Sequence, residues 1–179
     1  MSALLPSPWV RRWLALLPAG ATLLDFAAGS GRHALEAQRR GLRVTAIDRE
    51  ASALAALGPG VATRVADLET GAWPFGDERF DAVVVANYLF RPRFALLAAL
   101  LSPGGLLIYE TFAQGNERYG RPSNPAFLLR PGELYERSRR AGLLVLGYEH
   151  GLVARSGPAV VQRVCAVRAG GGEALRPLG

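Results

Sequence analysis

Short apolar runs alternate along this chain with segments whose composition suits helices. Five runs are bounded by polar or turn residues, and they are typical of buried strands: 22–26, 43–48, 61–66, 80–86 and 105–109. Helix-compatible segments lie between them at 32–40, 50–57 and 94–101. Because strands that alternate with helices form a parallel sheet covered on both faces, the pattern predicts an α/β fold.

The pattern changes after the fifth run. Residues 111–131 are rich in Gly, Asn, Pro and aromatic residues, and a loop of this length in a compact domain is usually functional, which favours a partly ordered lid over a pocket. A helix is expected from Pro131 to about Ala141, and the runs 143–148 and 159–167 are expected to form an antiparallel hairpin at the sheet edge.

The whole pattern therefore predicts one Rossmann-like, doubly wound domain. Its seven-stranded sheet is expected to be mostly parallel, with an antiparallel C-terminal edge strand. We expect the domain to span residues 1–169, and the Gly-rich residues 170–179 to form a flexible tail.

Polar side chains recur at the predicted strand ends with the period of the fold. They are 19 to 23 residues apart, at Asp25, Asp48, Asp67, Asn87 and Glu110. In open α/β sheets the carboxyl ends of the strands form the edge where ligands bind. The spacing therefore predicts a site at this edge.

The first of these ends is a glycine-rich turn, Asp25-Phe-Ala-Ala-Gly29-Ser-Gly31-Arg-His-Ala34. Glycines allow a tight turn and close backbone approach to a ligand, and the N–H groups that open the next helix suit an anionic group. The pattern also satisfies the dinucleotide fingerprint, and a strand-to-helix turn without any ligand stays open as an alternative.

Two further acids narrow the choice of ligand. Asp48 can accept hydrogen bonds from a ribose diol, or alternatively stabilise the N-terminus of the next helix. Asp67 is an acid that a nicotinamide site does not call for, whereas its carboxylate suits the exocyclic amine of adenine.

In this order and at this spacing, the motifs resemble those of class I S-adenosylmethionine-dependent methyltransferases. They are Asp25-x-Ala-x-Gly29-x-Gly31, Asp48, Ala66-Asp67, Phe80-Asp-Ala-Val-Val-Val-Ala-Asn87 and Leu101-Ser-Pro-Gly-Gly-Leu-Leu-Ile108. Within the class, Gly31-Arg-His-Ala-Leu35 and Pro131-Gly-Glu-Leu134 are most similar to the tellurite-resistance-type small-molecule methyltransferases.

The resemblance implies S-adenosylmethionine as cofactor. Asp25 and the backbone of 27–31 would hold its methionine part, Asp48 its ribose, and Asp67 with the Leu68 amide its adenine. The complete implied set is Asp25, Ala27, Gly29, Gly31, Asp48, Arg49, Asp67, Leu68, Asn87 and Leu89, the last two lying beneath the methyl-bearing end.

The chain departs from the family at His33, which replaces the usual third glycine. A helix-cap or solvent role is favoured for His33 over contact with substrate. The segment Ser7-Pro-Trp9 is expected either to lap over the cofactor or to anchor the first helix.

The cofactor's sulfonium methyl is already activated, so transfer is expected to be an in-line displacement that depends on proximity and alignment. No obligatory base stands out, and the candidates from chain position are His33, Tyr88, Glu110 and Tyr119. Contacts with the acceptor are expected from Tyr88, Glu110, Tyr119 and Asn124.

Charge raises the question of a nucleic-acid substrate. The net charge of +6 and the pI of about 10.4 come entirely from arginines, which never occur in runs longer than two. Because nucleic-acid binding needs a clustered basic face, we expect a small-molecule acceptor, with Arg118 and Arg121 keeping the alternative open.

Cysteine content and the N-terminus bear on location. Cys165 is the single cysteine, so an intramolecular disulfide is excluded, and no Cys/His set suits zinc. Arg11 and Arg12 interrupt the apolar N-terminus, which argues against a signal peptide, and no apolar run is long enough to span a membrane. A cytoplasmic monomer or homodimer is expected, without a membrane partner.

Two other classes of protein compete with the methyltransferase. An NAD(P)-binding oxidoreductase would use the glycine turn and Asp48, but it leaves Asp67 without a role and lacks a substrate domain. A non-catalytic ligand-binding protein is the third hypothesis, and the intact acidic set argues against it.

Overall fold

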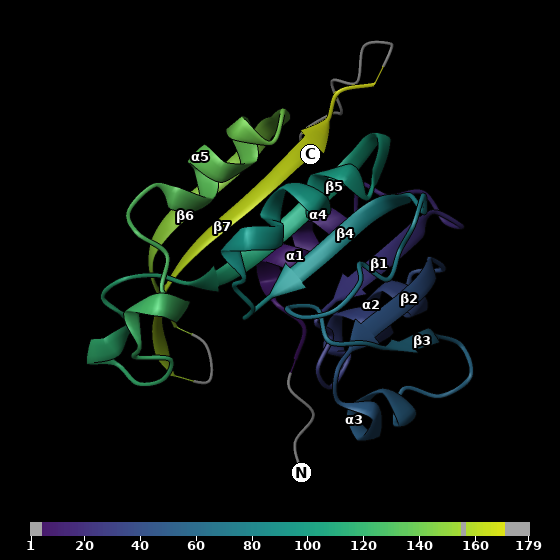
Figure 1. Ribbon diagram of the computed structural model, residues 1–179, viewed down its shortest axis with the longest axis horizontal. Helices are drawn as coiled ribbons and strands as arrows, with labels where there is room; N and C mark the ends of the chain where they lie inside the picture. The colour runs from purple at the N-terminus through teal and green to yellow at the C-terminus, as the bar shows by residue number, and fades with distance from the viewer. Residues whose placement is uncertain (1–4, 155–156, 171–179) are drawn as a thin grey trace.

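The computed structural model describes residues 5–154 and 157–170, and they form one seven-stranded sheet with helices on both faces (Figure 1). The strands are β1 Thr22–Phe26, β2 Arg43–Asp48, β3 Ala62–Val65, β4 Phe80–Ala86, β5 Leu101–Phe112, β6 Leu143–Ala154 and β7 Pro158–Arg168. The helices are α1 Pro8–Leu14, α2 Arg32–Arg39, α3 Ala51–Ala55, α4 Phe94–Ala99 and α5 Glu133–Arg140, with 3-10 turns η1 Arg91–Arg93, η2 Asn116–Arg118 and η3 Pro125–Phe127.

The strand order is β3-β2-β1-β4-β5-β7-β6. Neighbouring strands from β3 to β5 are parallel, while β7 runs antiparallel to both β5 and β6. The predicted Rossmann-like α/β sheet with an antiparallel C-terminal hairpin is therefore confirmed. Within that hairpin the last strand, β7, is internal, and β6 forms the edge of the sheet.

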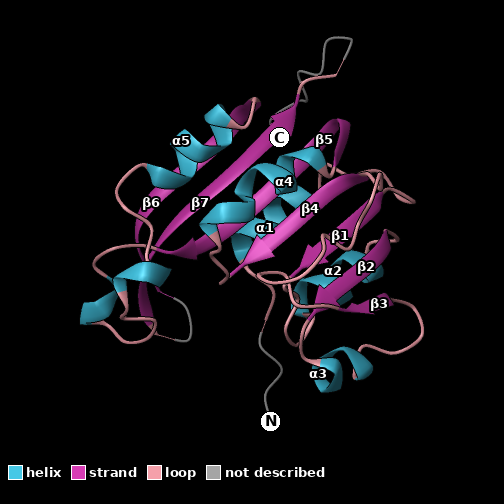
Figure 2. Cartoon of the chain, in the orientation of Figure 1, coloured by secondary structure: helices cyan, strands magenta, loops and turns pink. Residues whose placement is uncertain are grey.

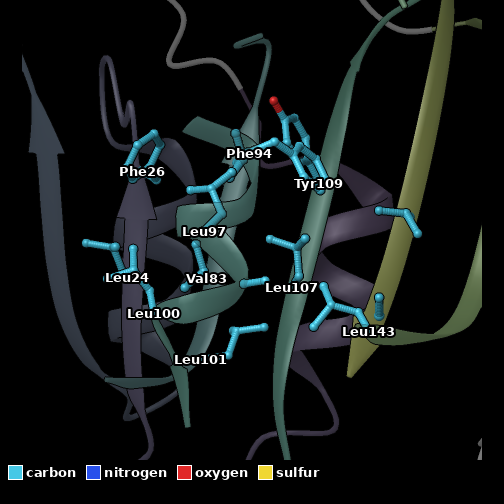
Figure 3. Close-up of a cluster of buried hydrophobic side chains, with 14 of the residues drawn as sticks. Leu24, Phe26, Val83, Phe94, Leu97, Leu100, Leu101, Leu107, Tyr109 and Leu143 are labelled. Carbon is cyan, nitrogen blue, oxygen red and sulfur yellow. The ribbon is translucent and has the colours of Figure 1, made fainter. Parts of the chain in front are cut away.

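Alternate residues of the central strands face two separate apolar cores. Leu23 and Val84 point to the face covered by α1, α2 and α3, and their neighbours Leu24 and Val83 point to the face covered by α4 and α5. Figure 1 shows α4 and α5 in front of the sheet, and Figure 3 shows the core beneath α4, where Phe94 stacks on Tyr109. Because both faces are buried, the central strands are mostly apolar along their length.

The strand β5 begins four residues earlier than the sequence pattern predicts. Leu101 pairs with Phe80, and Leu106 pairs with Ala82, so residues 102–105 bulge out of the ladder. A side chain at Gly105 would lie 2.9 Å from the carbonyl oxygen of Ser102, so the bulge requires a glycine there. The helix expected over 94–101 consequently ends at Ala99.

Strand order reverses between β1 and β4, because β2 and β3 lie on one side of β1 whereas β5 lies beyond β4. A crevice opens at such a switch point, outside the carboxyl ends of the strands, and it is the usual ligand site of open α/β sheets. Among the described residues, no helix is both long and apolar enough to cross a membrane. The expected tail falls almost entirely on residues 171–179, outside the described part of the chain.

Candidate cofactor site

A cavity of about 140 Å³ lies at the carboxyl ends of β1 to β4, next to the switch point. Its lining residues are Ala27, Asp48, Arg49, Ala66, Asp67, Leu68, Glu69 and Tyr88. The sequence predicted six of these as site residues, from four separate strand ends. It did not single out Ala66 and Glu69, which could have been found as the immediate neighbours of Asp67 and Leu68.

The glycine turn after β1 shapes one wall of this cavity. Ala27, Gly29 and Gly31 all have positive φ angles, of 57°, 53° and 67°. A Cβ atom at Gly31 would also lie 2.2 Å from Cδ2 of Leu57, so a side chain there would be strained by the positive φ and would displace the side chain of Leu57. The turn leads directly into α2 and brings Ala27 to the cavity.

Asp25 lies beneath the turn and does not line the cavity. Its side chain is 1% exposed, and its Oδ2 accepts a hydrogen bond from the backbone N–H of Ala34 at 2.9 Å. Burial raises the pKa of Asp25 to about 7, although the Ala34 hydrogen bond and the charge of Arg32 act in the opposite direction. The visible role of Asp25 is therefore to hold the turn against α2, and direct contact with the cofactor stays a prediction.

Asp48 joins the end of β2 to the glycine turn. Its Oδ2 accepts a hydrogen bond from the N–H of Gly29 at 2.8 Å, and its Oδ1 accepts one from the N–H of Glu50 at 2.9 Å. Each carboxylate oxygen has a second lone pair. Both oxygens can thus still accept a hydroxyl donor from a ligand in the cavity.

Asp67 is exposed and is oriented by its own turn. Its Oδ1 accepts hydrogen bonds from the N–H groups of Glu69 at 2.8 Å and Thr70 at 3.2 Å, and these bonds lower the pKa of Asp67. The carboxylate is therefore ionised at neutral pH, and Oδ2 is left outside these bonds. Such a group is an acceptor and suits an amine of a ligand.

Tyr88 lies beside the aromatic ring of Phe26, with the ring centroids 5.7 Å apart in an edge-to-face arrangement. Its hydroxyl is buried and has no hydrogen-bond partner among the described residues. Burial also raises the pKa of Tyr88. At neutral pH this hydroxyl can donate a hydrogen bond to a ligand, and it is poorly suited to the role of a base.

The other residues expected at the methyl-bearing end lie outside the cavity lining. Asn87 is exposed with a φ of 57°, and its N–H donates to the carbonyl oxygen of Glu110 at 2.9 Å. Leu89 is 8% exposed and packs in the core beneath α4.

Glu110 lies on the α1 side of the sheet, in a buried polar cluster. It is fully buried, it pairs with Arg163 at 2.5 Å, and it accepts a hydrogen bond from the Ser7 hydroxyl at 3.2 Å. Arg163 also contacts Glu149 at 3.0 Å. Substrate contact by Glu110 stays a prediction, and Arg163 is a residue that the sequence did not single out, because its pairing with Glu110 depends on where β7 enters the sheet.

His33 belongs to the same cluster. It is 2% exposed, so the expected solvent role is wrong, and its Nε2 accepts a hydrogen bond from the N–H of Ser7 at 3.2 Å. Trp9 is 4% exposed and packs in the core with Trp13, as the helix-anchor alternative predicts. Ser7 thus connects the start of α1 to Glu110 near the carboxyl end of β5.

The loop expected over residues 111–131 begins within β5, which ends at Phe112, and its remaining residues, 113–131, contain η2 and η3 (Figure 2). We call residues 113–131 the lid segment. Tyr119 is 47% exposed, and Asn124 accepts a hydrogen bond from the N–H of Ala126 at 2.9 Å, capping η3. Neither residue lines the cavity. Their contact with an acceptor stays a prediction.

The lid segment is fastened at one end by Arg91. Its guanidinium donates to the carbonyl oxygens of Ala126 at 2.6 Å and Leu128 at 2.8 Å, and it pairs with Glu133 at 2.7 Å. Burial would raise the pKa of Glu133, but hydrogen bonds from Arg91, the N–H of Arg130 and Arg137 lower it to about 2. Arg91 therefore connects the lid segment to the chain that follows β4.

Three solved structures share this fold over nine tenths of the chain. TehB from Haemophilus influenzae has a TM-score of 0.74 at 17% identity, with 91% of this chain and 62% of TehB covered, so the chain spans less than two thirds of TehB. A TehB-like SAM-dependent methyltransferase from Corynebacterium glutamicum has a TM-score of 0.66 at 18% identity, covering 90% and 89%. The 1,6-didemethyltoxoflavin-N1-methyltransferase of Burkholderia thailandensis, solved with S-adenosylhomocysteine, has a TM-score of 0.68 at 22% identity, covering 90% and 77%.

These likenesses define the class of fold, which is that of Rossmann-like methyltransferases. The sequence itself matches the methyltransferase domain family over residues 23–105, a range that includes the glycine turn and the whole cavity lining. No protein of curated function matches the sequence. The family match over residues 23–105 and the shared fold make the chain similar to class I S-adenosylmethionine-dependent methyltransferases, and neither the oxidoreductase nor the non-catalytic alternative gains support.

Proposed function

We propose that the protein transfers the methyl group of S-adenosylmethionine to a small-molecule acceptor by in-line displacement. The observation that carries this proposal is the single cavity that joins Asp48, Asp67 and Tyr88 at the switch point of the sheet. Asp48 would hold the ribose hydroxyls, and Asp67 with the Leu68 amide would hold the adenine. The turn from Ala27 to Gly31 would then receive the methionine part.

The hydrogen-bonding groups of the cavity match those of this cofactor. The carboxylates of Asp48 and Asp67 are held by backbone N–H groups, so they meet a ligand as oriented acceptors. An adenine amine and a ribose diol are donors that match them. The cofactor supplies an activated sulfonium methyl, and the protein's task is to align the acceptor and exclude water, which is worth up to about 7–11 kcal/mol.

The distribution of arginines favours a small acceptor over nucleic acid. The structure gathers Arg91, Arg130, Arg137 and Arg140 around a groove of about 210 Å³ between η1–α4 and α5. Three of them pair with Glu133, and Arg140 pairs with Glu136. Two carboxylates thus engage all four guanidinium groups and cancel half of their charge, so the groove attracts phosphates less than four free arginines would. The relative from Burkholderia thailandensis, solved with 1,6-didemethyltoxoflavin, is consistent with a small acceptor.

Transfer of a radiolabelled methyl group tests the proposal. The enzyme would be incubated with S-adenosylmethionine labelled in its methyl group and with cell extract separated into small-molecule, nucleic-acid and protein fractions. We expect label in the small-molecule fraction, and much less of it with an Asp48→Ala variant as control when the cofactor concentration is limiting. Label confined to nucleic acid or protein would contradict the small-acceptor proposal.

A second variant tests the lid segment. Replacing residues 115–123 with a Gly-Ser linker of equal length should leave the affinity for S-adenosylhomocysteine unchanged and abolish methyl transfer. Transfer at the wild-type rate would mean that Tyr119 has no part in binding the acceptor.

A cytoplasmic location is part of the same proposal and rests on the sequence alone.

A further inference from the structure

The chain between β3 and β4 carries the adenine-facing residues but has no regular secondary structure. Residues 66–79 form neither helix nor strand, and β3, which precedes them, is a four-residue edge strand. Leu68 and Phe75 are buried and anchor this adenine loop to the core. Apolar anchors fix the position of a loop, but they do not orient its polar groups, so the orientation of Asp67 depends on its turn and on whatever holds the peptide groups of that turn.

Arg93 supplies contacts from outside the loop. Its Nη1 donates to the carbonyl oxygen of Leu68 at 3.0 Å, and its Nη2 donates to that of Gly71 at 2.7 Å. The guanidinium carbon also lies 5.8 Å from the ring centroid of Trp73. The planar fork of arginine can hold two carbonyl groups at once, which the single ammonium of lysine does less well.

The peptide group between Leu68 and Glu69 is held at both ends. Arg93 binds its carbonyl oxygen, and the Oδ1 atom of Asp67 accepts a hydrogen bond from its N–H at 2.8 Å. Because a peptide group is planar and rigid, fixing the carbonyl also fixes the direction of the N–H. The Asp67 carboxylate is in turn oriented by that N–H.

We propose that Arg93 is a positioning residue for adenine recognition, acting through the Leu68–Glu69 peptide on the Asp67 carboxylate. This inference rests on the proposed role of Asp67 in binding the adenine amine. Arg93 belongs to η1, only a few residues beyond Tyr88, so the same turn also ties the adenine loop to the strand end that faces the acceptor. Arg93 needs no contact with the cofactor to exert this effect.

Arg64, which belongs to β3, provides a control because it contacts the same loop. Its Nη1 donates to the carbonyl oxygen of Pro74 at 2.9 Å, it pairs with Glu78, and its guanidinium lies 5.3 Å from the ring centroid of Phe75. Both arginines thus donate to a carbonyl oxygen of the loop and lie near one of its aromatic rings, but Arg64 pairs with Glu78 where Arg93 binds a second carbonyl. Arg64 makes them at the end away from Asp67, so Arg64→Ala loosens the loop without releasing the Leu68–Glu69 peptide.

Calorimetry with two ligands tests the proposal. S-adenosylhomocysteine carries the adenine amine, and S-inosylhomocysteine carries a carbonyl oxygen in its place, which Asp67 should reject. The wild type and Arg64→Ala should both prefer S-adenosylhomocysteine. Arg93→Ala should bind it about tenfold more weakly, roughly the effect of one charged hydrogen bond, and should lose most of the preference. Arg93→Lys should recover part of the preference for S-adenosylhomocysteine.

The ratio of the two affinities separates the possible failures. A wild type without any preference would overturn the adenine role of Asp67 and, with it, the proposal for Arg93. If the wild type prefers S-adenosylhomocysteine and Arg93→Ala keeps the same ratio, then Arg93 serves stability alone and the proposal is wrong. Should Arg93→Ala not fold, as judged by circular dichroism, Arg93→Gln and Arg93→Lys provide the same ratio, with the same two outcomes.

Discussion

Replacing Asp25 with asparagine should stabilise this protein at neutral and alkaline pH. Asp25 is buried beneath the glycine turn, where it accepts the N–H of Ala34. An asparagine has the same shape, its carbonyl oxygen can accept the same hydrogen bond, and its second polar atom is a donor, as in the protonated acid. The substitution therefore removes the cost of burying a charge and leaves the local geometry unchanged.

The size of the effect follows from the pKa of Asp25. Burial raises that pKa from 3.8 to about 7 in the folded protein. Between these two values the unfolded chain has lost the proton while the folded protein still binds it. The free energy of unfolding therefore falls as pH rises, by about 1.4 kcal/mol per pH unit. At pH 8 the wild type has lost about 4 kcal/mol of its free energy of unfolding, whereas Asp25→Asn keeps it because asparagine does not ionise.

Urea unfolding of both proteins from pH 4.5 to 8.5, followed by tryptophan fluorescence, measures this difference. At pH 4.5, which already lies above the unfolded pKa of 3.8, the variant should be ahead by about 1 kcal/mol, and its lead should grow up to about pH 7. The carbon chemical shift of the Asp25 carboxyl group provides a direct titration by NMR. Parallel stability curves over the whole range would show that Asp25 is ionised in the folded protein and would refute the reasoning.

Three further outcomes are expected. Asp48→Ala should weaken binding of S-adenosylhomocysteine by roughly 1.5–3 kcal/mol in calorimetry, the range for hydrogen bonds to a charged group; an unchanged affinity in a folded variant would rule out the ribose assignment. Arg91→Ala releases two carbonyl groups of the lid segment, so amide hydrogens of residues 124–130 should exchange faster while the affinity for S-adenosylhomocysteine stays the same; unaltered exchange would show that other contacts hold the lid. Because the pKa of Glu133 is lowered to about 2, its contribution to stability is complete above its ordinary value of 4.5 and is lost as pH falls towards 2; a Glu133→Gln variant should lack this part of the acid dependence, and identical acid unfolding curves would count against it.

The sequence predicts the parallel half of the sheet closely because its signals are local. The bounds of β1, β2 and β4 coincide with the predicted runs, since each run is mostly apolar and is followed by turn or polar residues. The start of β5 was missed because Ser102-Pro-Gly-Gly105 has the composition of a turn, whereas in the structure these residues form a bulge within a strand.

The candidate site, too, could be predicted from the sequence only where its signals are local. Asp48 and Asp67 come together because the period of the fold places successive strand ends at one edge, which the chain spacing reveals. Glu110 obeys the same spacing, but its surroundings depend on Arg163, 53 residues away, and on the entry of β7 beside β5. The contacts of Arg93 with the adenine loop were beyond prediction, because an irregular loop has no periodic pattern that places its carbonyl groups.

Because β7 lies between β5 and β6, the sheet cannot be assembled in the order in which its strands are synthesised. The strand that is synthesised last fits between two strands synthesised earlier, and in the described sheet β6 has no neighbour other than β7. A nascent chain that has not reached Pro158 therefore presents β5 as an open apolar edge, the kind of surface that pairs with other chains or recruits chaperones. Closure then depends on contacts distant in sequence, such as Leu106 with Val167, which favours slow, all-or-none completion of the domain once translation has passed this strand.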